Sequence, residues 1–327
     1  MDPLWALRQV AFQLERAGEP TYRVRAFRKA AEVLAALPDG EVARRVAAGT
    51  LTDLPGIGKA TAGVIADAVA GREPAYLSRF REPVVGGQAL RALLKGDCHT
   101  HSDWSDGGSP IREMAETARD LGHSWIVLTD HSPRLTVANG LSADRLLEQL
   151  DVVAELNAEL APFRILTGIE VDILDDGALD QRPELLQRLD LVVASAHSKL
   201  RMAAPEMTRR MVAAVSNPHV DVLGHCTGRL VVGKGRPEST FDAEAVFSAC
   251  VEHGTAVEIN SRPERRDPPG RLLRLAVELG CTFAIDSDAH APGQLDWLSF
   301  GCERAEECGV TPDRVINTLE AADLLSR

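Results

Sequence analysis

The chain has 327 residues, of which 45% are hydrophobic and 26% are charged, a composition typical of a globular protein long enough for two domains or for one large barrel with an appendage. No apolar run approaches the roughly 20 residues that a membrane helix needs, and the N-terminus lacks the features of a secretory signal, so we expect a cytoplasmic protein without membrane contact. The six cysteines show no Cys-x-x-Cys spacing, which argues against a zinc ribbon and against a disulfide framework.

The formal net charge of −12 is unevenly distributed along the chain. Residues 1–80 contain 11 Lys and Arg against 9 Asp and Glu, whereas the remaining residues contain 25 against 39. A body this acidic argues against a protein that is coated in nucleic acid. The mildly basic first part is compatible with a module that contacts phosphate.

Residues 1–80 are predicted to form a small all-α domain. Apolar residues follow the helical period over residues 4–14 and 27–34, and again over 41–48 and 64–69. The sequence LPGIGKA between the last two segments is typical of the turn of a helix-hairpin-helix. Its glycines let the backbone approach a phosphate closely, and the next helix presents free N–H groups at its N-terminus.

The candidate DNA contacts of this domain are glycines and cations that would contact phosphates without reading base sequence. They are Gly56, Gly58, Lys59, Arg23, Arg25, Arg28 and Lys29. For the four cations that precede the turn, the alternative interpretation is a solvated helix face.

Residues 81–95 are predicted to be a linker, and from residue 93 onward apolar runs alternate with helical stretches. The candidate strands are residues 93–97, 125–129, 165–170, 191–195, 220–224, 256–259 and 282–286, and the helical stretches include residues 110–121, 143–160 and 243–253. Alternating strands and helices imply an α/β protein with a parallel sheet. We therefore expect a seven-stranded barrel with its functional residues at the C-terminal ends of the strands.

Six of the seven apolar runs lead directly into residues that can bind a metal. The nine candidates are His99, His101, Asp106, His131, Glu170, His197, His225, Asp288 and His290. A hydrogen-bonded polar residue at a strand end explains any one of them equally well, but their recurrence at six strand ends favours one shared site. Imidazoles and carboxylates gathered in this way suit divalent ions that activate water, and without a thiolate among them zinc, manganese and iron all remain open. The exception is the run that ends in Glu258-Ile259-Asn260.

Seven segments now show a family resemblance. In this order along the chain, they are GDCHTHSDWSDG, IVLTDHS, LTGIEVDIL, ASAHSKL, VLGHCTGRL, VEINSRPERRDP and IDSDAH. Together they resemble the motifs of the PHP (polymerase and histidinol phosphatase) superfamily. The likeness covers residues 96 to about 300 and is greatest to the PHP domain of bacterial family X DNA polymerases. It implies a distorted (β/α)7 barrel with two or three divalent ions, and we assign residues 96–327 to a PHP metal-dependent phosphoesterase domain.

The resemblance also implies how the ligands are shared. A first ion would be held by His99, His101, Glu170 and Asp288, a second by the bridging Glu170 with His197 and His225, and a third by Asp106, His131 and His290. The implied nucleophile is a metal-bound water held by Glu170 and the ions, while the third ion neutralises charge on the phosphate. Cations that follow ligand-bearing strand ends are expected to contact that phosphate, and they are Lys199, Arg229, Arg262 and Arg265. The alternative, a solvated surface charge, is strongest for Lys199 and Arg265.

Residues 1–80 resemble the N-terminal helix-hairpin-helix domain of the same polymerases, through GEPTYRVRAFRKAAEVL and GTLTDLPGIGKATAGVIADAV. The chain departs from that family because a linker of about 15 residues leaves no room for the palm and fingers domains. Polymerase activity is therefore not implied.

Three hypotheses follow for the function. The first is a metal-dependent phosphoric ester hydrolase that acts on DNA ends or damaged DNA, as a 3′-phosphatase, a 3′–5′ exonuclease or an abasic-site nuclease. The alternative is a small-molecule phosphomonoesterase that resembles histidinol phosphatase. The third is a DNA-binding adaptor whose metals are structural, which the complete ligand set disfavours.

Overall fold

The computed structural model describes residues 1–80 and 86–327, and the chain divides into two compact units, Met1–Val84 and Val85–Arg327. Each unit has its own hydrophobic core. None of the helices in these described residues is long and apolar enough to cross a membrane.

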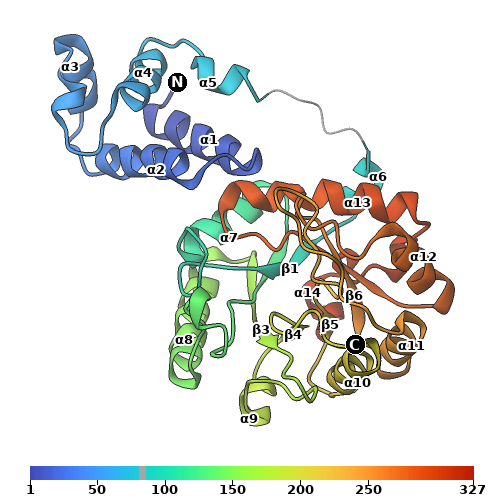
Figure 1. Ribbon diagram of the computed structural model, residues 1–327. Coiled ribbons are helices and arrows are strands. Elements are labelled where there is room, and N and C mark those ends of the chain that lie inside the picture. The colour runs from blue at the N-terminus through green and yellow to red at the C-terminus, as the bar shows by residue number, and fades with distance from the viewer. Residues whose placement is uncertain (81–85) are drawn as a thin grey trace. The chain divides into compact units, whose positions relative to one another are not determined.

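The first unit is helical throughout its described part (Figure 1). Its elements are α1 (Pro3–Arg16), α2 (Thr21–Ala35), α3 (Glu41–Ala48), the 3-10 turn η1 (Leu51–Asp53), α4 (Lys59–Val69) and α5 (Ala75–Ser78). The apolar faces of the helices meet in one core, where Leu7, Val10, Phe27 and Ile65 are at most 3% exposed. Each such side chain contributes about 1.5–3 kcal/mol on burial, so the helical spacing of the sequence accounts for this small domain.

The segment expected to be a linker, residues 81–95, is only partly described, since residues 81–85 lie outside the described residues. Beyond them, Gln88–Arg91 forms the short helix α6. Leu90 and Leu94 are buried in the core of the second unit. This part of the segment therefore packs with the second unit instead of forming a linker.

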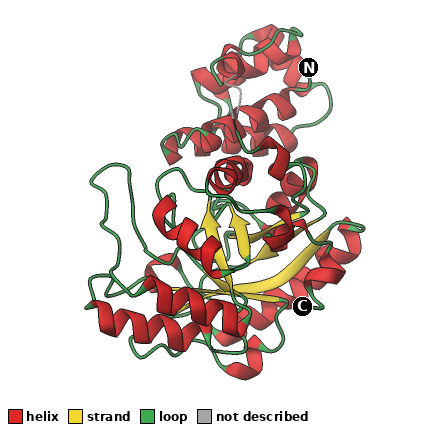
Figure 2. Cartoon of the chain, turned by 90° about the vertical axis from the view of Figure 1, so that its right-hand side faces the viewer, coloured by secondary structure: helices red, strands yellow, loops and turns green. Residues whose placement is uncertain are grey.

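The second unit is a barrel of seven parallel strands that are joined in chain order. The strands are β1 (Gly96–Thr100), β2 (Trp125–Leu128), β3 (Arg164–Asp172), β4 (Leu191–Ser195), β5 (Val222–Leu223), β6 (Ala256–Asn260) and β7 (Phe283–Asp286). Helices surround the strands (Figure 2), and they include α7 (Ile111–Asp120), α8 (Ala143–Leu160), α9 (Pro183–Leu186), α10 (Ala204–Val215), α11 (Ala243–His253), α12 (Gly270–Leu279), α13 (Leu298–Glu307) and α14 (Ala321–Leu324). A parallel sheet needs this cover because its strands are apolar on both faces.

All seven predicted runs form strands, so the α/β class and the seven-stranded parallel barrel are confirmed. The first strand begins later than the predicted residues 93–97, because pairing with β2 starts at Gly96 opposite Trp125. A Cβ at Gly96 would lie 2.2 Å from the Trp125 ring, so the close approach of the two strands requires glycine. As a result, His99 lies inside β1 and not after it.

Side chains close the barrel between its first and last strands. Among the described residues, one isolated parallel bridge, from Thr100 at the end of β1 to Ala289 in the segment after β7, stands in place of a continuous ladder between the two strands. The buried Asn317 completes the closure. Its amide donates to the carbonyl oxygens of Gly96 (3.0 Å) and Ile285 (2.9 Å), and its side-chain oxygen accepts from the N–H of Ile285 (2.7 Å).

Two buried aspartates make matching contacts across the same gap. The N–H of Cys98 on β1 donates to Asp286 Oδ1 (3.0 Å), and the N–H of Ser287 after β7 donates to Asp97 Oδ1 (3.2 Å). Each strand thus satisfies a backbone N–H group of the other, as buried polar groups require. Because β1 and the segment after β7 both carry candidate ligands, this closure fixes two parts of the site relative to each other.

The closure predicts that Asn317→Ala destabilises the second unit. The substitution leaves the N–H of Ile285 and two carbonyl oxygens without their partner, and each buried unsatisfied group costs about 1–3 kcal/mol. We expect the free energy of unfolding to fall by about 3 kcal/mol, measured by urea denaturation with circular dichroism. Asp313→Ala, at an exposed turn position, is the control, and equally small losses in both variants would contradict this account.

Candidate functional site

The nine candidate ligands lie at, or just after, the C-terminal ends of six strands. His99 and His101 are two residues apart on extended backbone, so their side chains point to the same face. Glu170 lies within β3. The others are Asp106 after β1, His131 after β2, His197 after β4, His225 after β5, and Asp288 and His290 after β7. Because the C-terminal ends of parallel strands meet at one mouth of a barrel, these six strands converge on one place.

The carboxylate of Glu170 is the centre of this cluster. It is 1% exposed, and five imidazole rings approach it. The distances to a carboxylate oxygen are 3.4 Å from His99 Nε2, 3.7 Å from His101 Nε2, 2.8 Å from His131 Nδ1, 3.3 Å from His197 Nε2 and 2.9 Å from His225 Nε2. Five side chains from four strands or their ends, β1, β2, β4 and β5, therefore share one carboxylate.

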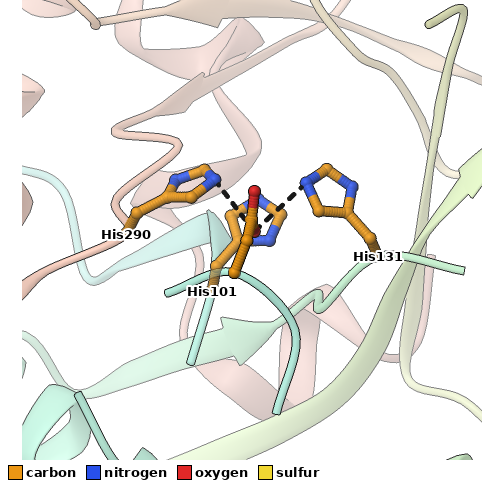
Figure 3. A group of neighbouring side chains, drawn as sticks. His101, His131 and His290 are labelled. Atoms are coloured by element: carbon orange, nitrogen blue, oxygen red, sulfur yellow. Dashed lines mark ion pairs between the residues drawn. The ribbon is translucent and has the colours of Figure 1, made fainter. Parts of the chain in front are cut away.

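A second group lies around Asp106 (Figure 3). Asp106 Oδ1 is 3.5 Å from His131 Nε2 and 3.3 Å from His290 Nε2. The ring of His101 lies between those of His131 and His290, with centroid distances of 4.5 Å and 4.1 Å. Since His131 faces Glu170 with Nδ1 and Asp106 with Nε2, it connects this group to the centre.

The carboxylate of Asp288 contacts both candidate ligands and cations. Its Oδ1 is 3.4 Å from His101 Nε2. Its Oδ2 accepts from Asn260 Nδ2 (3.0 Å) and lies 3.2 Å from Arg265 Nε. The Asp288 backbone has φ of 51°, a left-handed conformation that is uncommon outside glycine and that clusters at functional sites.

The structure brings all nine side chains into one continuous cluster, whereas the resemblance implied three ligand sets that share only Glu170. Among the nine candidates, the groups whose ligand atoms all lie within 4.8 Å of one another are His101 with Asp106, His131 and His290; His99 with His101 and Glu170; and His131 with Glu170 and His197. His101 and His131 each belong to two of these groups. His225 joins through its contact with Glu170, and Asp288 through its contact with His101.

Many polar atoms of the cluster are buried without a hydrogen-bond partner. Within residues 1–80 and 86–327, they include His99 Nε2, both ring nitrogens of His101, His131 Nδ1, both ring nitrogens of His197, His225 Nδ1 and Glu170 Oε2. An orphaned buried group costs about 1–3 kcal/mol. Ligand atoms that each lie about 2.0–2.2 Å from one ion are themselves about 3–3.5 Å apart, which is close to the spacing seen here. The residues present therefore fit divalent metal ions.

Burial and neighbouring charges shift the pKa values of the ligands in different directions. Burial lowers the pKa of His99 and His197, but nearby carboxylates, Glu170 first among them, outweigh it and raise the pKa of His99 well above its usual value and that of His197 to about 9. These two rings must therefore lose a proton when they bind an ion. Burial raises the pKa of Glu170, but the surrounding imidazoles outweigh it and hold that pKa well below the usual value. Burial, together with neighbouring imidazoles, lowers the pKa of His101 well below its usual value, which leaves a lone pair for an ion. Burial also raises the pKa of the Cys98 and Cys226 thiols, so both stay protonated and unsuited to bind metal.

Strand β6 supplies none of the nine candidates, yet it orients the ligands of its neighbours. Glu258 Oε1 lies 2.6 Å from His99 Nδ1, which directs the other ring nitrogen of His99 toward the centre. The second Glu258 oxygen accepts the backbone N–H of His225. Asn260 donates its side-chain amide to Asp288. Residues of β6 thus hold three ligands that come from three other strands.

Sequence reasoning missed the roles of Glu258 and Asn260, although a signal was present. All five positions of Ala-Val-Glu-Ile-Asn in β6 are buried, and a buried carboxylate needs a polar partner. Histidines that bind metal usually donate their second ring N–H to such a group. Asp172 makes the same kind of contact with His197, whose Nδ1 lies 3.4 Å away and whose backbone N–H donates to the carboxylate (3.1 Å).

A cavity of about 430 Å³ opens onto the cluster. Its lining residues are Asp106, His131, Leu135, Glu170, His197, His225, Leu230, Arg262, Glu264, Arg265, Asp288 and His290. Of the four cations expected to contact phosphate, Arg262 and Arg265 are among these lining residues, whereas Lys199 and Arg229 are not. Lys199 is 64% exposed and pairs with Asp175. Arg229 is instead bonded to the backbone oxygens of Arg265 (3.0 Å) and Arg266, so the expectation for Lys199 and Arg229 is not supported by their positions.

Arg265 has the freer guanidinium of the two cavity arginines. Arg262 donates to Glu264 Oε1 (2.9 and 3.1 Å) and to the backbone oxygen of Asp288 (3.2 Å), and it lies 3.0 Å from His290 Nδ1. Arg265 contacts Asp288 through Nε, but its buried Nη1 has no hydrogen-bond partner in the described part of the chain. This reverses the order expected from sequence, where Arg265 was the weaker candidate.

The helix-hairpin-helix turn of the first unit is built as its sequence suggests. Gly56 has φ of 94°, a left-handed conformation that favours glycine, and Gly58 is the N-cap of α4. Lys59 is the first residue of α4 and is exposed. The N–H groups of a first helical turn have no partners within the helix and carry the positive end of its dipole, so a phosphate could bind here.

The cations before this turn differ in their availability. Arg23 and Lys29 have side chains that are 49% and 62% exposed and pair with surface glutamates, and Arg25 is exposed. Arg28 was expected to contact DNA, but it makes a two-bonded ion pair with the buried Glu15 (2.7 and 2.8 Å). Because a buried carboxylate is costly without its partner, Arg28 serves to hold α2 against α1.

Comparisons with known proteins agree with this architecture. Residues 1–73 match the family model of a helix-hairpin-helix domain, and residues 97–262 match that of the PHP domain. The chain is 39% identical over 231 residues to the DNA polymerase/3′-5′ exonuclease PolX of Bacillus subtilis, across 71% of this chain and 40% of that protein. It is 31% identical over 233 residues to a "Probable phosphatase" of Thermoanaerobacter sp., across 68% of this chain and 89% of that protein.

The comparison with solved structures found histidinol phosphate phosphatase from Lactococcus lactis, in complex with zinc, L-histidinol and phosphate. Its sequence is 20% identical to this chain, the TM-score is 0.49, and the match covers 66% of this chain and 94% of that one. The family is set by the sequence matches, and the chain belongs to the PHP family. Its site and family together define a metal-dependent phosphoesterase. The chain spans 40% of the length of the B. subtilis polymerase.

The contact between Glu258 and His99 predicts that Glu258→Gln weakens metal binding. The amide keeps the size of the side chain but loses the charge that orients the ring, and such outer partners are worth about 10- to 100-fold in metal affinity. We expect a loss of this size for at least one ion, measured by competition with a chromophoric chelator. Glu278→Gln, at an exposed position of α12, is the matched control. Equal affinities in the two variants would show that Glu258 does not orient a ligand.

Proposed function

We propose that this protein hydrolyses phosphate esters of DNA, at strand ends or at damaged sites, as a 3′-phosphatase, a 3′–5′ exonuclease or an abasic-site nuclease. The observation that carries the proposal is the combination in one chain of the exposed Gly56–Lys59 turn with a phosphoesterase cluster. A relative with both a polymerase and a 3′–5′ exonuclease in its name supports it. The proposal includes DNA as the partner of the first unit and a cytoplasmic location.

The ligands proposed for the ions follow the family pattern. His99, His101, Glu170 and Asp288 would hold the first ion, Glu170 with His197 and His225 the second, and Asp106, His131 and His290 the third. Imidazole and carboxylate donors without thiolate suit zinc, manganese or iron. When bound, two or three such ions would activate a water for attack on phosphorus and neutralise charge on the phosphate oxygens.

The protein's own groups position the ester. Arg265 Nη1 is a buried donor without a partner among the described residues, and a phosphate oxygen in the cavity would satisfy it through a charge-assisted hydrogen bond. Arg262 is engaged with Glu264 and Asp288, so it stiffens the wall beside Arg265. Asp106, 37% exposed, lies at the more open edge of the cluster, where a substrate enters.

A small-molecule phosphomonoesterase remains the second candidate, and one observation favours it. The "Probable phosphatase" of Thermoanaerobacter is covered over 89% of its length by the match to this chain. A barrel of this family therefore makes up nearly all of that protein. In this reading the first unit would serve packing or association.

A panel of substrates distinguishes the two candidates. The full chain, loaded in turn with zinc, manganese or iron, would be offered oligonucleotides with a 3′-phosphate, a recessed 3′ end or an abasic site, and histidinol phosphate. We expect kcat/KM to be highest for one of the DNA substrates. Efficient turnover of the small ester with no reaction at any DNA end would reject the DNA proposal.

The position of Lys59 predicts a salt-sensitive loss of DNA binding. Lys59→Ala removes one phosphate contact, so the slope of log affinity against log salt should decrease by about 1. Fluorescence anisotropy with a labelled duplex at several salt concentrations measures it. Arg72→Ala, beyond the other end of α4 and 64% exposed, is the control. If both variants keep the slope of the unmodified protein, Lys59 does not contact the backbone.

Because Arg265 has a donor without a partner among the described residues, we predict that replacing it reduces catalysis without loss of metal. Arg265→Ala should lower kcat/KM by about 100-fold, the usual effect of removing one donor to developing charge. The metal content, measured by mass spectrometry, should stay unchanged. Lys199→Ala, which changes a cation outside the cavity, should leave kcat/KM intact. Equal effects of the two substitutions would show that Arg265 has no special role.

A further inference from the structure

Two apolar side chains interrupt an otherwise charged cavity wall. Of the twelve described lining residues, ten are histidines, carboxylates or arginines, and the other two are Leu135 and Leu230. Both leucines are partly exposed. An apolar side chain that is left in contact with water at the mouth of a site gains free energy when a ligand covers it.

The backbone holds each leucine in place. Leu135 follows β2, and its N–H donates to the carbonyl oxygen of Ser132 (3.3 Å). Leu230 follows β5 and exchanges two backbone hydrogen bonds with Arg236 (both 2.9 Å). The next residue, Val231, donates its N–H to the carbonyl oxygen of Glu264 (2.7 Å). The leucines are thus parts of bonded turns.

The two leucines come from loops that follow strands which are not neighbours in the barrel. On one side of the barrel β3 and β4 separate β2 from β5, and on the other side β6, β7 and β1 separate them. A group that enters the cavity can therefore contact an apolar side chain from each of the two loops. The ligand cluster and Arg265 lie in the same cavity, so the phosphate and the flanked group can belong to one molecule.

The charges of the described lining residues are already matched among themselves. Glu264 is bound by Arg262 (2.9 and 3.1 Å). Glu170 and Asp106 are surrounded by imidazoles, and Asp288 contacts both an imidazole and an arginine. In this part of the cavity no carboxylate is left to receive an ammonium group, which would need one.

We infer that Leu135 and Leu230 form the subsite for the alcohol part of the ester, and that this part is the sugar and base of a nucleotide. The inference rests on the proposed phosphoesterase function and deepens it. A nucleoside is neutral, and its base has apolar ring faces that can cover the two leucines. Ethanolamine, a small alcohol with an ammonium group, has no ring face and would lack a counter-charge here.

The test compares two substrates and the binding of two ligands. Leu135→Ala, Leu230→Ala and the double variant would be assayed with thymidine 3′-phosphate and with ethanolamine phosphate. Each leucine removed should raise KM for the nucleotide about tenfold, the usual effect of losing apolar contact in a pocket, with little change in kcat. Val137→Ala and Val232→Ala are controls, because these valines are 93% and 61% exposed in the same two loops and outside the described cavity lining.

Binding without turnover keeps the test independent of activity. Calorimetry would measure the binding of a non-hydrolysable phosphonate analogue of thymidine 3′-phosphate, and of inorganic phosphate, to the metal-loaded protein. The inference expects weaker nucleotide binding in the leucine variants with unchanged phosphate binding. It is overturned if the leucine and valine variants behave alike, or if the unmodified protein prefers ethanolamine phosphate. If no ester is hydrolysed but the leucines still select nucleotide over phosphate, the proposed function fails and the subsite stands.

Discussion

The second unit depends on the contact between the buried carboxylate of Glu170 and the imidazole rings around it. This carboxylate is 1% exposed, and five imidazole nitrogens lie within 3.7 Å of it. Removing a charge from water costs several kcal/mol unless it is compensated, and several facing nitrogens within the described residues lack hydrogen-bond partners. Divalent cations would satisfy the carboxylate and the ring lone pairs together. The surrounding architecture is therefore best understood as a frame for cations.

The frame is made by residues that are not themselves ligands. Asn317, Asp97 and Asp286 join β1 to β7, which brings the ligands at the two ends of the strand order together. Glu258 and Asn260 on β6 then orient side chains from β1, from the end of β5 and from the segment after β7. Stability and metal binding are thus coupled, because the contacts that close the barrel also bring together the strand ends whose ligands Glu258 and Asn260 orient.

The barrel and the convergence of its nine candidate ligands could be predicted, because strand and helix patterns are local and parallel strands end at one mouth. The actual partners of individual charges could not. Arg28 shares its sequence context with Arg25, but only the fold shows that it pairs with the buried Glu15. Likewise, the positions of Lys199 outside the cavity and Arg265 within it depend on loop conformation. The start of β1 was also misjudged, since strand pairing and not hydrophobicity determines it.

Anomalous X-ray diffraction from crystals of the purified protein tests the central claim most directly. Data collected on both sides of the absorption edges of zinc, manganese and iron locate and identify bound ions. The account predicts two or three peaks inside the cluster, with one or more at about 2.0–2.2 Å from the Glu170 carboxylate and another between Asp106, His131 and His290. A map without peaks at Glu170, in protein that still hydrolyses phosphate esters, would contradict it.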